Sequence, residues 1–332
     1  MRRTVGVTLA AASVLTIVGT LPAHSATAPP RYLPGSTCRA FPANNYWHAD
    51  ISKLPVNRLS TTWLNSAGAG RTSTLHLHPD FGSSGDVRNP YGIPYVVENG
   101  KPKVKVTFDY ADESDKVAYP LWPTMPVEGG LGSGGDMHAI VVDAATCTLY
   151  ETWNTQYNAD AKAWSAGSGA VWKLKSNALR PNTWTSADAA GLPILPGLLR
   201  WDEVKAGRVD HAIRFTLPKT FGAPIWPARH QANSGSGAQY APFGARFRLK
   251  ASYPISRFGK QTQVVLKAMK KYGIVLADNG SAFYFQGAPS NSWPDQLIGE
   301  LKSVSANAFE AVNTLPMRVS PNSAQVKAAY VK

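Results

Sequence analysis

Short apolar runs with a two-residue period recur along the chain from about residue 95 onwards. Valine, isoleucine, leucine and aromatic residues alternate with other residues in these runs, as in a half-buried strand. The 28 glycines and 25 prolines punctuate the chain, as turns between many short strands require. The pattern predicts strands at residues 95–97, 104–110, 138–143, 148–153, 170–174, 209–217, 245–251, 274–277 and 282–286.

Helical spacing is rare and occurs late in the chain. Residues 263–272 place Val265, Leu266 and Met269 on one face, and Gly273 follows as a stop. A capping-box pattern at 292–295 predicts a second helix, and residues 202–206 suggest a short helical turn.

These helices do not alternate with the strands, so the sequence does not indicate an α/β fold. It predicts an all-β protein, an antiparallel β-sandwich of jelly-roll type with two or three peripheral helices.

The N-terminus has the features of a secretory signal peptide. Arg2 and Arg3 precede an apolar run over residues 5–21, and small residues stand at 23 and 25. The run is short for a membrane span and is followed by proline, so we expect no membrane anchor and cleavage after Ser25, with cleavage after Ala26 as the alternative. The prediction is a signal peptide over 1–25, a flexible arm over 26–37 and a single secreted domain over 38–332.

The chain is basic, with 34 Lys and Arg against 21 Asp and Glu and a net charge of +13. Such a charge favours anionic partners, including an anionic polysaccharide or a cell wall. Because no Lys/Arg run is interleaved with aromatic residues, we do not expect a nucleic-acid partner. We expect a monomer.

Two cysteines, Cys38 and Cys147, are present. In an oxidising compartment an isolated pair is more often bridged than free, so we predict a disulfide between them. Neither has a metal-ligand pattern beside it, which argues against a catalytic thiol.

The stretch 134–154 reads as a β-hairpin whose open end is polar. A two-residue turn at Ala144 and Ala145 would place His138 opposite Glu151. Their face is apolar near the turn, and Asp136 and Trp153 continue it at the open end. A strand face that runs from a core into a cleft has this pattern.

A His–Glu pair of this kind orients a general acid or base, or supplies two metal ligands. The alternative is a buried structural pair. Trp153 favours the reactive interpretation, because aromatic platforms bind sugars. Which metal would bind, if any, stays open.

Further candidates lie elsewhere in the chain. His211 points inward from the strand 209–217, and His230 stands at a strand end. Possible substrate-binding residues are Trp226, Arg200 and Arg229. An acidic turn contains Asp109, Asp112, Glu113 and Asp115 and is a possible structural Ca²⁺ site.

Several stretches resemble blocks of a large group of exported actinobacterial and fungal proteins. They are the hairpin and "NALRPNTWTSADAAGLPILPGLLRWDEVKAGRVDHAIRFT", "WPARH", "GARFRLKASYPI" and "LKAMKKYGIVLADNGS". Members of this group look like concanavalin A-like jelly rolls, and some similar sequences occur beside carbohydrate-binding modules. The resemblance implies that fold and secretion, favours polysaccharide as the substrate, and assigns no catalytic residues.

These observations together predict a secreted enzyme that cleaves an extracellular polysaccharide. As a hydrolase, Glu151 would be the acid or nucleophile, tuned by His138, with Asp136 or Glu128 as the second carboxylate. As a lyase, His138 or His211 would abstract the proton, and Arg200, Arg214 or Arg229 would neutralise a substrate carboxylate. The alternative from another class is a non-catalytic glycan- or wall-binding protein.

Overall fold

The computed structural model describes Met1 and residues 31–83, 91–232 and 234–331, and the statements below concern these residues. Strands dominate, as predicted, and four short α-helices accompany them. These are α1 (Ser60–Ser66), α2 (Trp201–Lys205), α3 (Lys260–Lys271) and α4 (Asp295–Lys302). The predicted signal peptide and most of the predicted arm lie outside the described residues.

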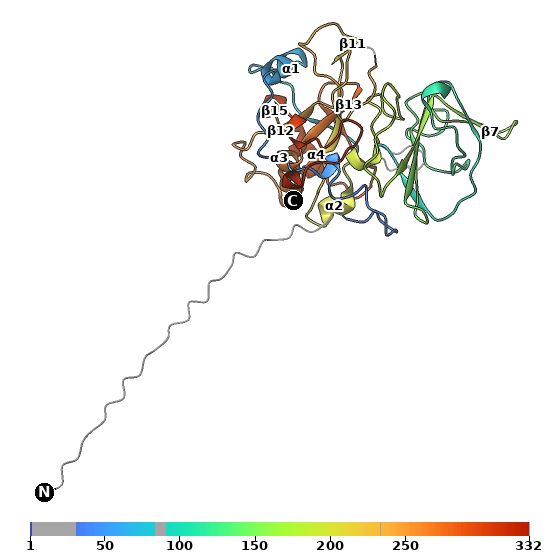
Figure 1. Cartoon of the computed structure of the whole chain (residues 1–332), viewed down its shortest axis with the longest axis horizontal. Helices are drawn as coiled ribbons and strands as arrows, with labels where there is room; N and C mark the ends of the chain where they lie inside the picture. The colour runs from blue at the N-terminus through green and yellow to red at the C-terminus, as the bar shows by residue number, and fades with distance from the viewer. Residues whose placement is uncertain (2–30, 84–90, 233, 332) are drawn as a thin grey trace.

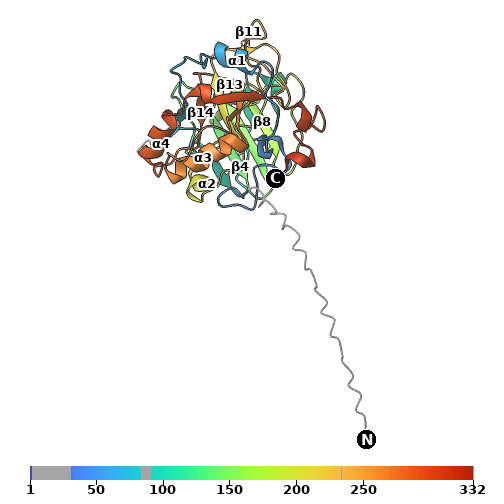
Figure 2. The same ribbon diagram turned by 90° about the vertical axis from the view of Figure 1, so that its left-hand side faces the viewer.

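A six-stranded sheet forms one half of the molecule (Figure 1). Its strands, in spatial order, are β1 (His78–Asp80), β14 (Tyr284–Gln286), β9 (Ile213–Leu217), β13 (Ile274–Asn279), β12 (Arg246–Leu249) and β15 (Phe309–Val312). Helices α2, α3 and α4 lie together at one side of this sheet (Figure 2). Val265, Leu266 and Met269 of α3 are fully buried, as the helical spacing predicted.

Two smaller sheets form the other half, drawn mostly in green in Figure 1. One contains β2 (Val96–Glu98), β4 (Ala139–Asp143), β5 (Thr148–Trp153) and β8 (Ser168–Lys173). The other contains β3 (Val106–Phe108), β7 (Ala163–Ala166) and β6 (Gln156–Asn158). A separate pair joins β10 (Thr220–Phe221) to β11 (Ser234–Gly235).

The hairpin β4–β5 separates two hydrophobic cores. Ile140 and Leu149 on one face belong to the larger core, which extends into the six-stranded sheet. Val141 and Tyr150 on the other face belong to the smaller core, next to β3 and β7. The hairpin is therefore covered on both sides, which explains the unbroken apolar run in β4.

The predicted antiparallel arrangement holds only in part, because the sheets also contain parallel strand pairs. Strand β9 runs parallel to β13, and β2 runs parallel to β4. Parallel pairs also join β1 to β14 and β3 to β7. Apolar alternation determines which face a residue lies on, but it contains no information about the direction of the neighbouring strand.

The predicted register of the central hairpin is also wrong. Ile140 pairs with Glu151, and Asp143 pairs with Thr148, so four residues form the turn. The Oδ1 atom of Asp143 accepts a hydrogen bond from the backbone N–H of Ala145 at 3.1 Å, and Cys147 adopts a positive φ of 49°. The shift is two residues, so each side chain keeps its face while its partner changes.

The predicted disulfide between Cys38 and Cys147 is confirmed. It connects the N-terminal segment to the turn of the hairpin over a sequence separation of 109 residues. Leu33, in the described part of the predicted arm, is buried against the larger core. Among the described residues, no helix is long and apolar enough to cross a membrane.

Candidate active site

A cavity of about 370 Å³ lies beside the open end of the hairpin. Its walls come from the loop before β4, the ends of β5, β8 and β13, the turn near residue 113, and the segments 185–189 and 230–232. Three carboxylates line it, those of Glu113, Asp136 and Asp278. No lysine or arginine is among its lining residues in the described chain.

Asp136 and Trp153 form one edge of the cavity, as the pattern of the hairpin predicted. The indole Nε1–H of Trp153 donates a hydrogen bond to Oδ1 of Asp136 at 3.0 Å. The backbone N–H of Asn154 donates to the carbonyl oxygen of Asp136 at 2.7 Å. Tyr110 lies next to Trp153, with ring centroids 6.2 Å apart. These two rings give the cavity an aromatic wall.

Asp278 lies at the end of β13, with 24% of its side chain exposed. One of its carboxylate oxygens is 3.6 Å from Nη2 of Arg214. Burial raises the pKa of Asp278 to about 8, and the negative charge of Asp188 adds to that rise while Arg214 and His138 oppose it. At neutral pH this carboxyl therefore keeps its proton.

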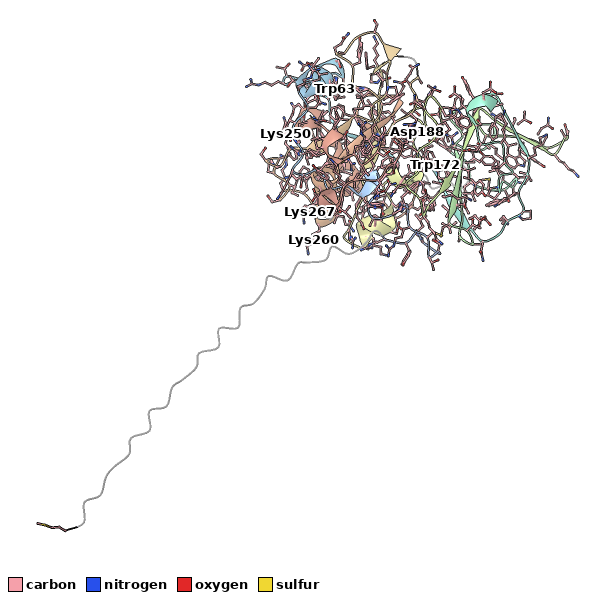
Figure 3. All side chains as sticks on the ribbon, viewed as in Figure 1. Trp63, Trp172, Asp188, Lys250, Lys260 and Lys267 are labelled. Atoms are coloured by element: carbon pink, nitrogen blue, oxygen red, sulfur yellow. A yellow bond between two sulfur atoms is a disulfide. The ribbon has the colours of Figure 1, made fainter. Side chains whose placement is uncertain are left out.

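Asp188 and Arg214 form a buried ion pair behind Asp278. The guanidinium donates from Nε at 2.9 Å and from Nη2 at 2.8 Å to the two oxygens of Asp188. Figure 3 shows Asp188 where the two halves of the molecule meet. Because Arg214 gives both of these donors to Asp188, it neutralises Asp278 only in part.

Glu113 and His230 face each other on another wall of the cavity. Oε2 of Glu113 lies 3.6 Å from Nε2 of His230 and accepts the backbone N–H of Thr185 at 2.8 Å. The Nδ1 atom of His230 is 2.8 Å from the carbonyl oxygen of Ala189. A carbonyl only accepts, so Nδ1 carries a hydrogen and Nε2 is directed towards Glu113.

His138 is buried next to the cavity, and its partner is Glu128. Its Nδ1 makes a short hydrogen bond to Oε2 of Glu128, and its Nε2 lies 2.9 Å from the carbonyl oxygen of Ala187. Burial alone would lower the pKa of His138, but the charge and hydrogen bond of Glu128 outweigh burial and raise it to about 9. The predicted pair of His138 with Glu151 does not form.

Glu151 instead supports the core, away from the cavity lining. It is completely buried and accepts N–H groups from Trp172, Ile194 and Leu195 at 2.9–3.1 Å. Burial raises its pKa to about 7, although these donors act in the opposite direction. This carboxylate holds the segment before residues 195–197 against β5 and β8.

We therefore expect Glu151→Gln to reduce stability without a specific loss of function. The amide nitrogen would direct a donor towards other N–H donors, and a buried unsatisfied donor costs about 1–3 kcal/mol. Chemical denaturation should show a loss of this size, while activity per folded molecule stays unchanged. The matched control is Asp160→Asn, which removes a charge from an exposed turn. A large fall in activity with unchanged stability would show that Glu151 acts in the reaction.

The remaining sequence candidates lie outside the cavity. His211 bonds to Glu203 at 3.0 Å, and Glu203 makes a close ion pair with Arg200 in the same buried network. Arg229 donates to the backbone of Arg180 and Pro321. The indole of Trp226 is buried and donates to the carbonyl of Ser323. Their positions do not support the predicted contacts with substrate.

The acidic turn does not gather its carboxylates into a cation site. Asp115 is held by the guanidinium of Arg180 and by the N–H of Val171, and Glu113 faces the cavity. Asp109 and Asp112 are exposed. The one group in the described chain with metal-ligand geometry is Glu128, Asp136 and His138.

Asp278 is the main site residue that the sequence analysis missed. It follows the apolar run 274–277, at a strand end where a polar residue is usual. Asp188 was missed as well, in a stretch without regular periodicity. A signal was present in Arg214, a charged residue in the middle of a strand, whose burial required an acidic partner nearby.

Comparisons with protein-family models, curated proteins and solved structures find no match to this chain. The resemblance to concanavalin A-like proteins therefore stays a prediction.

Proposed function

We propose that the protein is a secreted hydrolase that cleaves glycosidic bonds of an extracellular polysaccharide in this cavity. One observation carries the proposal: the carboxyl groups of Glu113, Asp136 and Asp278 line a single cavity that also has an aromatic wall. Glycoside hydrolysis requires a pair of carboxyl groups on either side of the bond to be cleaved. Sugar rings pack against aromatic side chains such as Trp153 and Tyr110.

Asp278 and Glu113 are the pair that we assign to the reaction. Asp278 holds a proton at neutral pH and donates it to the oxygen of the leaving sugar as the C–O bond breaks. Glu113, next to His230, accepts a proton from the water that attacks the anomeric carbon. The oxygen of the water becomes the anomeric hydroxyl oxygen of the new reducing end. Asp278 has then lost one proton and Glu113 has gained one, so the protons balance.

The lining of the cavity favours a neutral polysaccharide at the point of cleavage. The carboxylates of Glu113 and Asp136 repel a uronic-acid chain, and no lysine or arginine is present among the described lining residues to offset this repulsion. A lyase requires a cation at the substrate carboxylate, but Arg214 is committed to Asp188 and Arg229 to backbone carbonyls. The positive charge of the whole chain would instead attract the protein to an anionic wall.

Secretion and a relationship to concanavalin A-like jelly rolls belong to the same proposal. The disulfide and the predicted signal peptide support export, since disulfides persist in oxidising compartments. The strand-rich architecture supports a sandwich fold.

The deciding experiment is an assay of products by mass spectrometry over a panel of neutral and uronic polysaccharides. Hydrolysis adds one water to each cleaved bond, so the expected products are saturated oligosaccharides from a neutral chain. Unsaturated products from a uronic chain would show a lyase and overturn the proposal.

A binding-only protein is the second candidate, favoured by the paired rings of Tyr110 and Trp153. It predicts retention on a polysaccharide column with no products from any chain. Trp153→Ala would then abolish retention, whereas loss of the Asp278 proton donor would leave it unchanged.

A further inference from the structure

We propose that Glu128, Asp136 and His138 bind one divalent metal ion, Zn²⁺ or Mn²⁺, at the edge of the cavity. One ligand atom from each side chain lies within 4.8 Å of the other two. Two carboxylates and one imidazole are a mixed oxygen and nitrogen donor set. The proposal concerns binding and does not depend on the hydrolase assignment.

The hydrogen bonds of His138 leave the correct nitrogen for a metal. Its Nε2 faces the carbonyl oxygen of Ala187 at 2.9 Å, so Nε2 carries a hydrogen. Nδ1 faces Glu128 and shares a proton with it, so Nδ1 is the nitrogen that a metal would take when that proton is displaced. Ligating histidines typically donate their other N–H to a backbone carbonyl or a carboxylate, which fixes the ring and its tautomer. A metal would replace the proton that His138 and Glu128 share.

A hydrogen bond from a neighbouring side chain also orients Asp136. The Nε1–H of Trp153 bonds to Oδ1 of Asp136, so one oxygen is held in place. Ligating carboxylates are commonly fixed by such a second hydrogen bond. The side chain of Asp136 is exposed and lines the cavity, so water or a substrate oxygen can complete the coordination.

The backbone holds the three ligands together. Met137, between Asp136 and His138, has a positive φ of 45°, a conformation that is unfavourable for a non-glycine residue. The N–H of Glu128 donates to the carbonyl oxygen of His138 at 3.0 Å, which ties the two segments side by side. Glu128 and His138 are thus fixed relative to each other before a ligand arrives.

The donor set selects among metals. Ca²⁺ and Mg²⁺ take oxygen ligands and would leave the imidazole unused. Zn²⁺ and Mn²⁺ accept both donor types, and nitrogen and oxygen sites bind Zn²⁺ more tightly than Mn²⁺. We therefore expect affinity to fall in the order Zn²⁺, Mn²⁺, Ca²⁺.

The test is calorimetric titration of the full-length secreted protein, freed of metal by a chelator, with ZnCl₂, MnCl₂ and CaCl₂ in turn. One Zn²⁺ per chain is expected. Asp136→Asn should weaken Zn²⁺ binding by more than about 10-fold. Because the Asp136 side chain is exposed, we expect the variant to fold as the wild type does, and circular dichroism checks this. The matched control Asp160→Asn removes the same charge from an exposed turn that is not part of the cavity lining or the proposed ligand set, and it should leave binding unchanged.

A second variant tests the orienting bond. Trp153→Phe keeps an aromatic ring but removes the N–H that holds Asp136, and loss of such an outer partner typically weakens metal binding about 10–100-fold. Absence of stoichiometric Zn²⁺ and Mn²⁺ binding by the wild-type protein would overturn the proposal. So would unchanged binding by folded Asp136→Asn, or an equal loss in Asp160→Asn.

Discussion

Replacement of Asp278 by asparagine should reduce the rate of polysaccharide cleavage by about 10²–10⁴-fold, the usual contribution of a general acid. Asparagine has nearly the same shape, and its carbonyl oxygen can still accept the N–H of Asn279, which bonds to Oδ1 at 2.7 Å. The variant has no proton to donate to the leaving sugar oxygen. Initial rates of reducing-end formation on the substrate found by the product assay measure the effect.

The stability of the same variant should depend on pH in a defined direction. The pKa of Asp278 is about 8 in the folded protein and near 3.8 when exposed, so the folded state binds the extra proton between these values. The wild-type protein loses this contribution as pH rises from about 4 to 8. Asp278→Asn does not titrate, so its stability relative to wild type should rise over that range.

Thermal denaturation at pH 5 and pH 8.5 measures this difference, and Asp160→Asn is the matched control because its side chain is exposed. Wild-type cleavage should also fall as pH rises through about 8, since the acid is then ionised. A folded Asp278→Asn variant with full activity would exclude Asp278 as the acid.

Much of the fold follows from apolar alternation. The strand predicted at 148–153 is β5 with the same bounds, and the helix around Met269 buries the face that its spacing indicated. Strand β7, which has two exposed positions of four, was missed, as was the polar helix α1. Both elements are stabilised by the packing of a few buried side chains. They therefore have too few apolar positions to produce a recognisable period in the sequence.

Strand partners were harder to predict than strands. A shift of the strand pairing by two residues leaves Ile140 and Glu151 on the same faces of the hairpin. The apolar alternation is therefore equally compatible with the predicted and the observed register. The four-residue turn is decided by Asp143 and by the disulfide at Cys147. The consequence was functional: the reactive role was assigned to Glu151, whereas the partner of His138 is Glu128.

The sequence patterns indicated three residues that line the cavity as catalytic or substrate-binding candidates: Asp136 and Trp153 of one hairpin, and His230 at a strand end. Asp136 and Trp153 were recognised because they stand at the open end of two adjacent strands. Asp278 and Glu113 come from segments far apart in the chain, and both line the same cavity only because the two halves of the molecule pack together. Contacts of this kind depend on tertiary structure, which local periodicity does not determine.

Replacement of Asp188 by asparagine should lower stability and move the pH dependence of cleavage. Asp188 is fully buried and accepts two N–H groups from Arg214, and breaking a buried ion pair costs about 3–5 kcal/mol. An amide keeps one acceptor and directs a donor at the guanidinium. Urea denaturation measures this loss.

The change in pH dependence separates a catalytic consequence from a structural one. Asp188 raises the pKa of Asp278, whereas Arg214 and His138 lower it, so removing the charge of Asp188 should lower the pKa of Asp278 from about 8. The loss of activity with rising pH should then begin at a lower pH, and cleavage should recover in acid. This recovery distinguishes Asp188→Asn from Asp278→Asn, which has no proton to donate at any pH.

The measurement is a pH–rate profile of the folded fraction, with the double variant Asp188→Asn/Asp278→Asn as the control. Because Asp188 would act through Asp278, its substitution should have little further effect on the rate once Asp278 is gone. A stability loss with an unchanged alkaline limb would mean that Asp188 only supports the core. If the fall in rate at high pH moved to lower pH, the buried ion pair of Asp188 and Arg214 would set the proton affinity of Asp278. The contact between the two halves of the molecule would then also control the reaction.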